Sequence, residues 1–190
     1  MSFRTGTNGL LPERALAFPV ALRAFTHADA ARVQVLAGER AVAETTALIP
    51  HPYPDGAAAA WIAAQARDRA AGREYTYAVT AAGDELVLGA IALRPAATEG
   101  DNLGYWIGRA YWGRGYATAA ARAVIALAFT LLELDLVTAS HLARNPASGR
   151  VLEKCALRPL RTEVRLHRGA DEPFCVRVLS RAAWEQDVAG

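Results

Sequence analysis

Alternating apolar and polar positions along the chain predict a series of short strands. Residues 18–26 alternate in this way, and two further strand-like runs, 74–79 and 86–93, are separated by a polar turn at 81–84. Because so short a turn joins them, we expect these two runs to form an antiparallel hairpin. Four more strand-like runs follow, at residues 103–107, 136–142, 160–167 and 174–179.

Apolar residues spaced by three and four predict the helices between these strands. The longest helix is expected over residues 115–133, where Tyr116, Ala120, Ala123, Leu127 and Leu131 would share one buried face. Shorter helices are expected over 28–36, 56–71 and 146–155, the last with Asn145 as its N-cap and Pro146 in its first position. Residues 49–56 contain three prolines, so we expect a loop there.

The order of these elements predicts an α/β (α+β) domain. One strand, two helices, three antiparallel strands and then alternating helices and strands fit a mixed, mostly antiparallel sheet of about seven strands with helices on both faces. The crossover from strand 103–107 through the long helix to strand 136–142 predicts a parallel pair. We expect residues 1–17 to be a flexible lead-in and residues 18–190 to form a single domain.

Composition narrows the classes of function. The chain has 190 residues, of which 53% are hydrophobic and 21% charged, which argues against disorder and coiled coil. Its net charge of only +2 argues against a nucleic-acid or membrane partner, so any phosphate binding must be local. Cys155 and Cys175 lack a C-x-x-C arrangement, which predicts no metal site and a reducing compartment. The N-terminus lacks an apolar signal core, and we expect a cytoplasmic protein.

The segment most informative about chemistry is Y-W-I-G-R-A-Y-W-G-R-G-Y-A-T, residues 105–118. A strand ends there, glycines remove side-chain bulk from the turn, and a helix begins with free backbone N–H groups, which together favour an anion such as a pyrophosphate. The alternative is a turn whose glycines only allow positive φ. The spacing fits neither a P-loop nor a dinucleotide-binding fingerprint.

This segment resembles the acetyl-CoA loop of the GNAT N-acetyltransferase superfamily, in which Gln or Arg, two residues, Gly, one residue and Gly or Ala follow in order. Here Trp112 stands in the first position of W-G-R-G-Y-A. The preceding L-G-Y-W-I-G, the later N-P-A-S-G-R-V-L-E-K-C-A-L and the early I-P-H-P-Y resemble the RimJ/RimL-type branch, which acetylates ribosomal-protein N-termini. The resemblance covers roughly residues 18–185.

The resemblance implies acetyl-CoA as a cosubstrate, with no metal, and an amine as the acceptor. It implies that backbone amides of the loop hold the pyrophosphate, that strand 103–107 pairs with the pantetheine arm, and that Asn145 contacts the pantetheine chain. The implied cofactor-binding residues are Ile107, Gly113, Arg114, Gly115, Tyr116, Ala117, Thr118 and Asn145. Asn145 can equally serve as the N-cap of a helix, and Arg114 can equally be a solvated surface residue without a ligand.

Amine attack on a thioester needs a base, a donor for the oxyanion and a partner for the departing thiolate. Ser148 occupies the position of a serine in the resembling branch, and we expect it to assist the thiolate; the alternative is an ordinary residue of a first helical turn. The branch often carries a glutamate where this chain has Asn102, so we expect neighbouring Asp101 or Glu99 to act as the base, directly or through water.

Other residues are candidates for acceptor binding or for the role of the base. His51 and Tyr53 in the Pro-rich loop, together with His141, are candidates for acceptor binding, while Glu163 and His141 are alternative bases. Trp106 and Trp112 are expected in the core.

Three functions therefore stay open. The first is acetylation of a protein N-terminus or small amine, the second is detoxification of an aminoglycoside or polyamine by the same chemistry, and the third is an acyl-CoA-binding sensor that has lost its base. The sequence also leaves a homodimer open.

Overall fold

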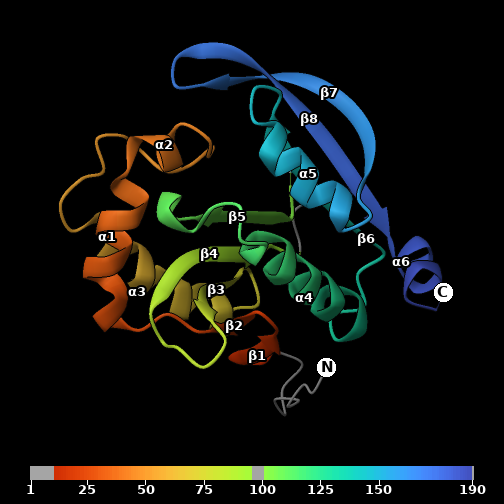
Figure 1. Ribbon diagram of the computed structural model, residues 1–190, viewed down its shortest axis with the longest axis horizontal. Helices are drawn as coiled ribbons and strands as arrows, with labels where there is room; N and C mark the ends of the chain where they lie inside the picture. The colour runs from red at the N-terminus through yellow and green to blue at the C-terminus, as the bar shows by residue number, and fades with distance from the viewer. Residues whose placement is uncertain (1–10, 96–100, 190) are drawn as a thin grey trace.

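The computed structural model describes residues 11–95 and 101–189 and contains two sheets (Figure 1). Every neighbouring pair of strands is antiparallel. The first sheet runs in chain order through β1 (Arg14–Ala17), β2 (Val20–Arg23), β3 (Tyr75–Ala81), β4 (Val87–Leu93) and β5 (Leu103–Ile107). The second has the order β6 (Leu136–Leu142), β8 (Ala170–Ser180), β7 (Arg158–His167).

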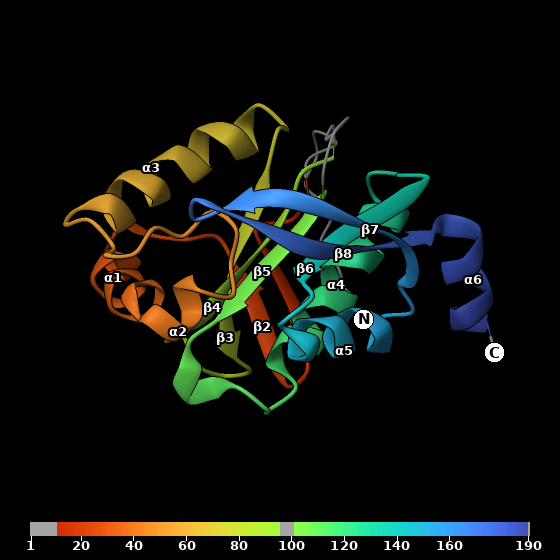
Figure 2. The same cartoon turned by 90° about the horizontal axis from the view of Figure 1, so that it is seen from above.

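Helices cover both faces of the five-stranded sheet. One face packs against α1 (Ala30–Gly38) and α3 (Ala57–Ala70), and the other packs against α4 (Tyr116–Thr130) (Figure 2). The remaining elements are α2 (Arg40–Ala43), α5 (Pro146–Lys154), α6 (Arg181–Ala189) and the short 3-10 turns η1 (His27–Asp29) and η2 (Arg109–Tyr111). No helix among residues 11–95 and 101–189 is long and apolar enough to cross a membrane.

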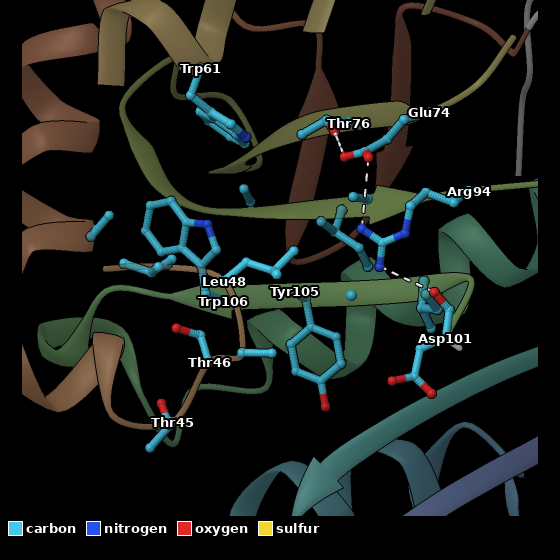
Figure 3. A pocket seen from close by; sticks show the side chains of 18 of the residues that line it. Thr45, Thr46, Leu48, Trp61, Glu74, Thr76, Arg94, Asp101, Tyr105 and Trp106 are labelled. Atoms are coloured by element: carbon cyan, nitrogen blue, oxygen red, sulfur yellow. Dashed lines mark hydrogen bonds and ion pairs between the residues drawn. The ribbon is translucent and has the colours of Figure 1, made fainter. Parts of the chain in front are cut away.

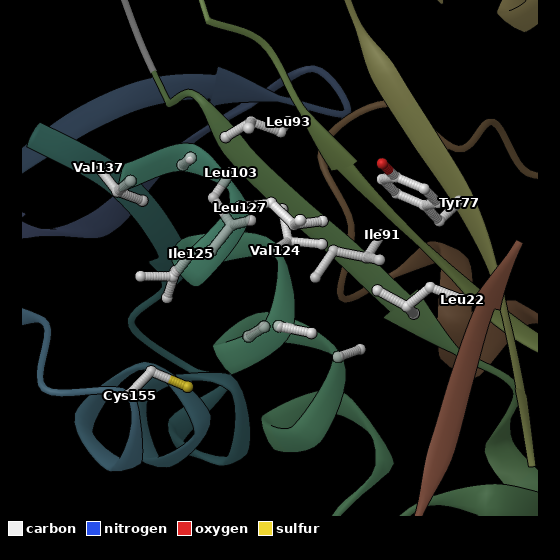
Figure 4. Packing of buried hydrophobic residues seen from close by; sticks show 14 of the residues in the cluster. Leu22, Tyr77, Ile91, Leu93, Leu103, Val124, Ile125, Leu127, Val137 and Cys155 are labelled. Atoms are coloured by element: carbon white, nitrogen blue, oxygen red, sulfur yellow. The ribbon is translucent and has the colours of Figure 1, made fainter. Parts of the chain in front are cut away.

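The main core lies between α4 and the first sheet (Figure 4). The middle of α4 is buried on every side, and Val124 and Leu127 are completely inaccessible to solvent. They pack against Leu22, Ile91 and other apolar residues of β2 to β5. The helix predicted from its periodicity is therefore confirmed, but it is buried more widely than on one face.

Strands β5 and β6 do not pair, which corrects the expected parallel pair in a single sheet. The buried side chain of Asn102 joins the two strands instead. Its Oδ1 accepts a hydrogen bond from Thr138 N at 2.7 Å, and its Nδ2 donates to Leu136 O at 3.4 Å. Among the described residues no strand pairing joins β5 to β6. The mixed α/β fold is confirmed, with eight strands in two sheets.

The N-terminal prediction is wrong in two respects. The predicted strand 18–26 is the second half of a hairpin, since β1 precedes it and the chain turns at Pro19 after a cis peptide bond. The predicted lead-in 1–17 is too long, because β1 pairs with β2 and Leu11 is buried in the core. Helix α6, which the apolar pattern does not predict, follows β8.

A buried ion pair stabilises the start of α1. Arg23 donates to both oxygens of Asp29, each at 2.8 Å, and both side chains are about nine-tenths buried. Burial by itself would raise the pKa of Asp29, but the hydrogen bonds from Arg23 and Thr26 outweigh it and lower that pKa below its ordinary value.

Candidate functional site

The turn between β5 and α4 has the geometry of an anion site. Gly113 and Gly115 have φ values of 76° and 79°, a region that side-chain-bearing residues rarely adopt. Gly115 is the N-cap of α4, and a Cβ atom on either glycine would meet no heavy atom within 4 Å. The first N–H groups of a helix lack partners within the helix, so the open space above this turn faces hydrogen-bond donors and the positive end of α4.

A cavity of about 300 Å³ lies over this turn and reaches the edge of β5 and the first turns of α5. It is called the loop cavity here. Its walls include Arg114, Arg150 and Lys154, three cations that suit phosphate groups. The structure brings all the expected cofactor-binding residues into its lining: Ile107, Gly113, Arg114, Gly115, Tyr116, Ala117, Thr118 and Asn145.

A second cavity, of about 580 Å³, lies on the α3 side of the sheet. It is called the large cavity here. Its floor carries the small residues Ala90, Ala92 and Gly104 of β4 and β5, which leaves room above the strands. Its remaining walls come from the loop that follows α2, from α3, and from β6 and β8. Five aromatic side chains line it: Tyr53, Trp61, Tyr105, Trp106 and Phe174.

The two cavities meet at five residues that line both of them. These residues are Thr45, Thr46, Tyr105, Trp106 and Ser148. Figure 3 shows the labelled side chains of Thr45, Thr46 and Tyr105 on the same side of the large cavity. A ligand that extends from the loop cavity can therefore meet a second ligand at this junction.

Tyr105 and Ser148 are hydrogen-bonded to each other at the junction. Their hydroxyl oxygens lie 2.8 Å apart, and the Tyr105 hydroxyl also donates to Ser148 O at 3.2 Å. Ser148 is held in place because its backbone N–H donates to Asn145 Oδ1 at 3.3 Å, which confirms Asn145 as the N-cap of α5. Burial raises the pKa of Tyr105 well above its ordinary value, so this hydroxyl stays protonated at physiological pH.

Asp101 lines the large cavity and is held by two partners. Its Oδ2 accepts hydrogen bonds from Ser140 Oγ and from Arg165 Nη1, the latter at 3.1 Å. Its Oδ1 is buried and has no hydrogen-bond partner among the described residues. One oxygen of Asp101 is therefore engaged, and the other is free to meet a ligand in the cavity. Glu163 is engaged by Arg161 and Arg165.

Of the other residues predicted for the site, some line the large cavity and one does not. Tyr53 and His141 line the large cavity, whereas His51 is exposed and lines neither cavity. The Nδ1 atom of His141 lies 3.0 Å from Leu142 O, and its buried Nε2 packs against Gly149. Glu99 lies outside the described residues.

Sequence reasoning missed several residues of these walls. Trp106 packs against a smaller buried apolar cluster, as expected, but it also lines both cavities. Trp112, also expected in the core, is 46% exposed, and its Nε1 donates to Ile107 O. Tyr105 lies within the Gly-containing segment, but nothing in the sequence pairs it with Ser148. Thr45 and Thr46 follow α2 in a stretch without any motif.

No metal site is formed by the part of the chain that the structure describes. Nowhere within it do three His, Cys, Asp or Glu side chains gather so that they could bind an ion. Cys155 is buried, and burial raises the pKa of its thiol to about 11.

Comparison with known proteins agrees with this geometry. The family model described as an acetyltransferase (GNAT) domain matches residues 20–158. The chain is 34% identical over 84 residues to the probable N-acetyltransferase YjcK of Bacillus subtilis (strain 168). That match spans 43% of this chain and 46%, about half, of the relative.

Two solved structures share the fold at low sequence identity. RimJ of Mycobacterium smegmatis, solved in complex with CoA-disulfide, is 19% identical with a TM-score of 0.75, over 90% of this chain and 88% of that one. The microcin C7 self-immunity acetyltransferase MccE, solved in complex with acetyl-CoA and AMP, is 12% identical with a TM-score of 0.76, over 90% of this chain and 98% of that one.

Proposed function

The chain belongs to the GNAT acetyltransferase domain family, and from this premise we propose that it transfers the acetyl group of acetyl-CoA to a primary amine. The observation that carries the proposal is the junction of the two cavities. The loop cavity has the anion-binding turn and the cations that a CoA pyrophosphate needs, and the large cavity can receive an acceptor. Among the residues that the structure describes, five border both cavities: Thr45, Thr46, Tyr105, Trp106 and Ser148.

In this proposal the start of α4 and the edge of β5 bind acetyl-CoA, the acetyl donor. The backbone N–H groups around Gly113 and Gly115 would bind the pyrophosphate, and the unpaired edge of β5 would bind the pantetheine amides as an added strand. The thioester would then lie at the junction of the two cavities. Acetyl-CoA supplies the reactive acyl group when it is bound.

Tyr105 and Ser148 act as neutral hydrogen-bond donors to the reacting atoms. The amine nitrogen forms a bond to the carbonyl carbon, the C–S bond then breaks, and the sulfur leaves with the electron pair and is protonated by the proton released from nitrogen. A buried tyrosine with a raised pKa is too weak an acid to lose its proton to a thiolate. Its hydroxyl and that of Ser148 can instead stabilise the charge that develops on oxygen or sulfur.

The amine must be deprotonated before it attacks. We propose that Asp101 accepts this proton, directly or through one water, because its Oδ1 is buried at the large cavity without a partner. Asn102 cannot take this role, since its side chain has no basic group and fastens β5 to β6.

Two acceptor classes fit the proposal: a protein N-terminus, as in the RimJ-type branch, and a small amine. The alternative of an acyl-CoA-binding sensor is favoured by one observation, the ion pair with Arg165 that already engages one oxygen of Asp101.

The experiment is thiol release from acetyl-CoA with peptides and small amines as acceptors, together with mass spectrometry of the product. An acetylated amine formed in step with free CoA supports transfer. Binding of acetyl-CoA without turnover for any acceptor would support the sensor, and absence of binding would refute both.

A further inference from the structure

The end of the large cavity next to β3 carries an unusual set of polar groups. Glu74, immediately before β3, accepts a hydrogen bond from Thr76 Oγ1 at 2.8 Å, and Arg94 Nη1 lies 3.7 Å from its other oxygen (Figure 3). Asp68 and Gln65 of α3 line the same cavity. This group of four, Gln65, Asp68, Glu74 and Arg94, is called the inner end below.

The ionisable side chains that line the large cavity favour a cation. Three are carboxylates, those of Asp68, Glu74 and Asp101, and one is the guanidinium of Arg94; the others are Tyr53, Tyr105 and His141. The partners of Asp68 and Asp101, which are Arg73 and Arg165, do not line the cavity. The C-terminal end of α3 adds partial negative charge close to Asp68.

An unsatisfied hydrogen-bond acceptor independently supports the binding of a ligand with N–H groups at the inner end. Gln65 is only 9% exposed, and its Nε2 donates to Trp61 O at 3.1 Å. Its Oε1 is buried without a partner among the described residues. A buried amide oxygen without a donor costs free energy, and a ligand N–H group would remove that cost.

The rest of the cavity suits an apolar spacer that ends in a cation. Trp61 and Trp106 present aromatic rings, which attract cations as well as methylene groups, and the floor is made of alanine and glycine (Figure 3). Arg94 lies next to Gly104 of this floor, and a Cβ there would make an ordinary contact with Arg94 Nη2 at 3.5 Å.

We infer that the inner end binds a second cationic nitrogen of the acceptor, so that the acceptor is a small diamine. One nitrogen reacts at Tyr105 and Ser148, and the other donates to Gln65 and Glu74. This inference rests on the proposed acetyl transfer, which it makes more specific.

The register of the sheet sets the length of such a diamine. Tyr105 pairs with Ile91, and Tyr75, next to Glu74, pairs with Leu93, so residues 105 and 75 lie about 12 Å apart from strand geometry. A heptane spacer places its two nitrogens about 10 Å apart, at roughly 1.2 Å per bond of an extended chain.

The test compares four acceptors that differ only at the far end: heptane-1,7-diamine, 7-aminoheptan-1-ol, heptylamine and 7-aminoheptanoic acid. We expect kcat/KM for the diamine to exceed that for the alcohol by roughly 10- to 10²-fold, the effect of a hydrogen bond to a charged group. The acid should be the poorest. Equal rates for the diamine and heptylamine, or a preference for the acid, would overturn the inference.

Variants assign the effect to the inner end. Glu74→Gln keeps an oxygen for Thr76 but removes the charge, and it should lower kcat/KM for the diamine about 10-fold or more while changing the alcohol less than about 3-fold. Gln65→Leu removes the unpartnered oxygen from a buried position and should act in the same direction without harming folding. Glu185→Gln on exposed α6 is the control and should change neither acceptor.

Calorimetry separates this inference from the proposed function. The four compounds are titrated into the protein with CoA present, and tighter binding of the diamine that Glu74→Gln abolishes supports the inner end even without turnover. A peptide beginning with alanine is added to the kinetic panel. If it is acetylated with a higher kcat/KM than the diamine, transfer stands and the diamine assignment is wrong.

Discussion

Replacement of Tyr105 by Phe removes a single hydroxyl from the junction of the two cavities. That hydroxyl is hydrogen-bonded to Ser148 Oγ at 2.8 Å and contributes no packing that Phe lacks. Loss of one preorganised donor to a developing charge costs about 10²- to 10³-fold in kcat when the donor touches the charge. Because Ser148 stays in place and shares the role, we expect kcat to fall roughly 10- to 10²-fold, with acetyl-CoA affinity within about 3-fold of wild type.

The pH profile distinguishes a neutral donor from a titrating acid. Burial raises the pKa of Tyr105 above the ordinary value of about 10, so its deprotonation should produce no alkaline limb in kcat up to about pH 10. Wild type and Tyr105→Phe should then have parallel profiles, offset by the loss in rate. An alkaline limb present in wild type and missing in the variant would refute this reasoning, as would an unchanged kcat.

Two further variants complete the assay. In Tyr77→Phe a buried hydroxyl that donates to Pro12 O at 2.8 Å is lost outside both cavities, so stability should fall as in Tyr105→Phe while kcat is retained. The double variant of Tyr105→Phe with Ser148→Ala should lose more than the product of the two single losses, since each hydroxyl covers part of the role when the other is missing. Fully multiplied effects would show that they act independently.

Gly115→Glu should abolish measurable acetyl-CoA binding in calorimetry because its carboxylate opposes the pyrophosphate, whereas Gly56→Glu, at a helix N-cap of the same backbone geometry, should bind normally; equal affinities would contradict the loop assignment. Asp101→Asn should lower kcat/KM roughly 10- to 10²-fold and alter its ascending pH limb, and an unchanged profile would remove Asp101 as the base. Asp29→Asn should cost about 2–4 kcal/mol in the free energy of unfolding at pH 7, since the buried guanidinium of Arg23 then loses one of its two carboxylate partners and keeps Glu85. The lowered pKa of Asp29 stabilises the fold above its unfolded pKa of about 4, so in urea titrations the gap between wild type and Asp29→Asn should narrow as pH falls below that value; a constant gap would contradict the ion-pair account.

The spacing of apolar and polar residues predicts a helix or strand correctly where the pattern runs without interruption through the whole element. The limits of β5 and β6 agree with prediction because both are short apolar runs bounded by polar residues or glycine. Strand β1 was missed because it has only four residues and the turn at Pro19 interrupts the alternation. The two-sheet arrangement depends on Asn102 meeting Thr138, which lies 36 residues away.

The same distinction holds for the site. The loop cavity could be predicted because its glycines and the start of α4 are adjacent in sequence. The junction could not, since Tyr105 and Ser148 are 43 residues apart and meet only when α5 packs beside β5. Likewise the pairing of Asp101 with Arg165, across 64 residues, and the inner end are products of the fold.

The central claim is that the two cavities hold a donor and an acceptor that react where they meet. Its most direct measurement is a single turnover of the protein with acetyl-CoA and heptane-1,7-diamine, quenched over time and analysed by mass spectrometry. The account predicts one acetylated amine for each CoA released, and a slower appearance of both, by the same factor, in Tyr105→Phe. Release of CoA without an acetylated amine, or product formation unaffected by Tyr105→Phe, would contradict it.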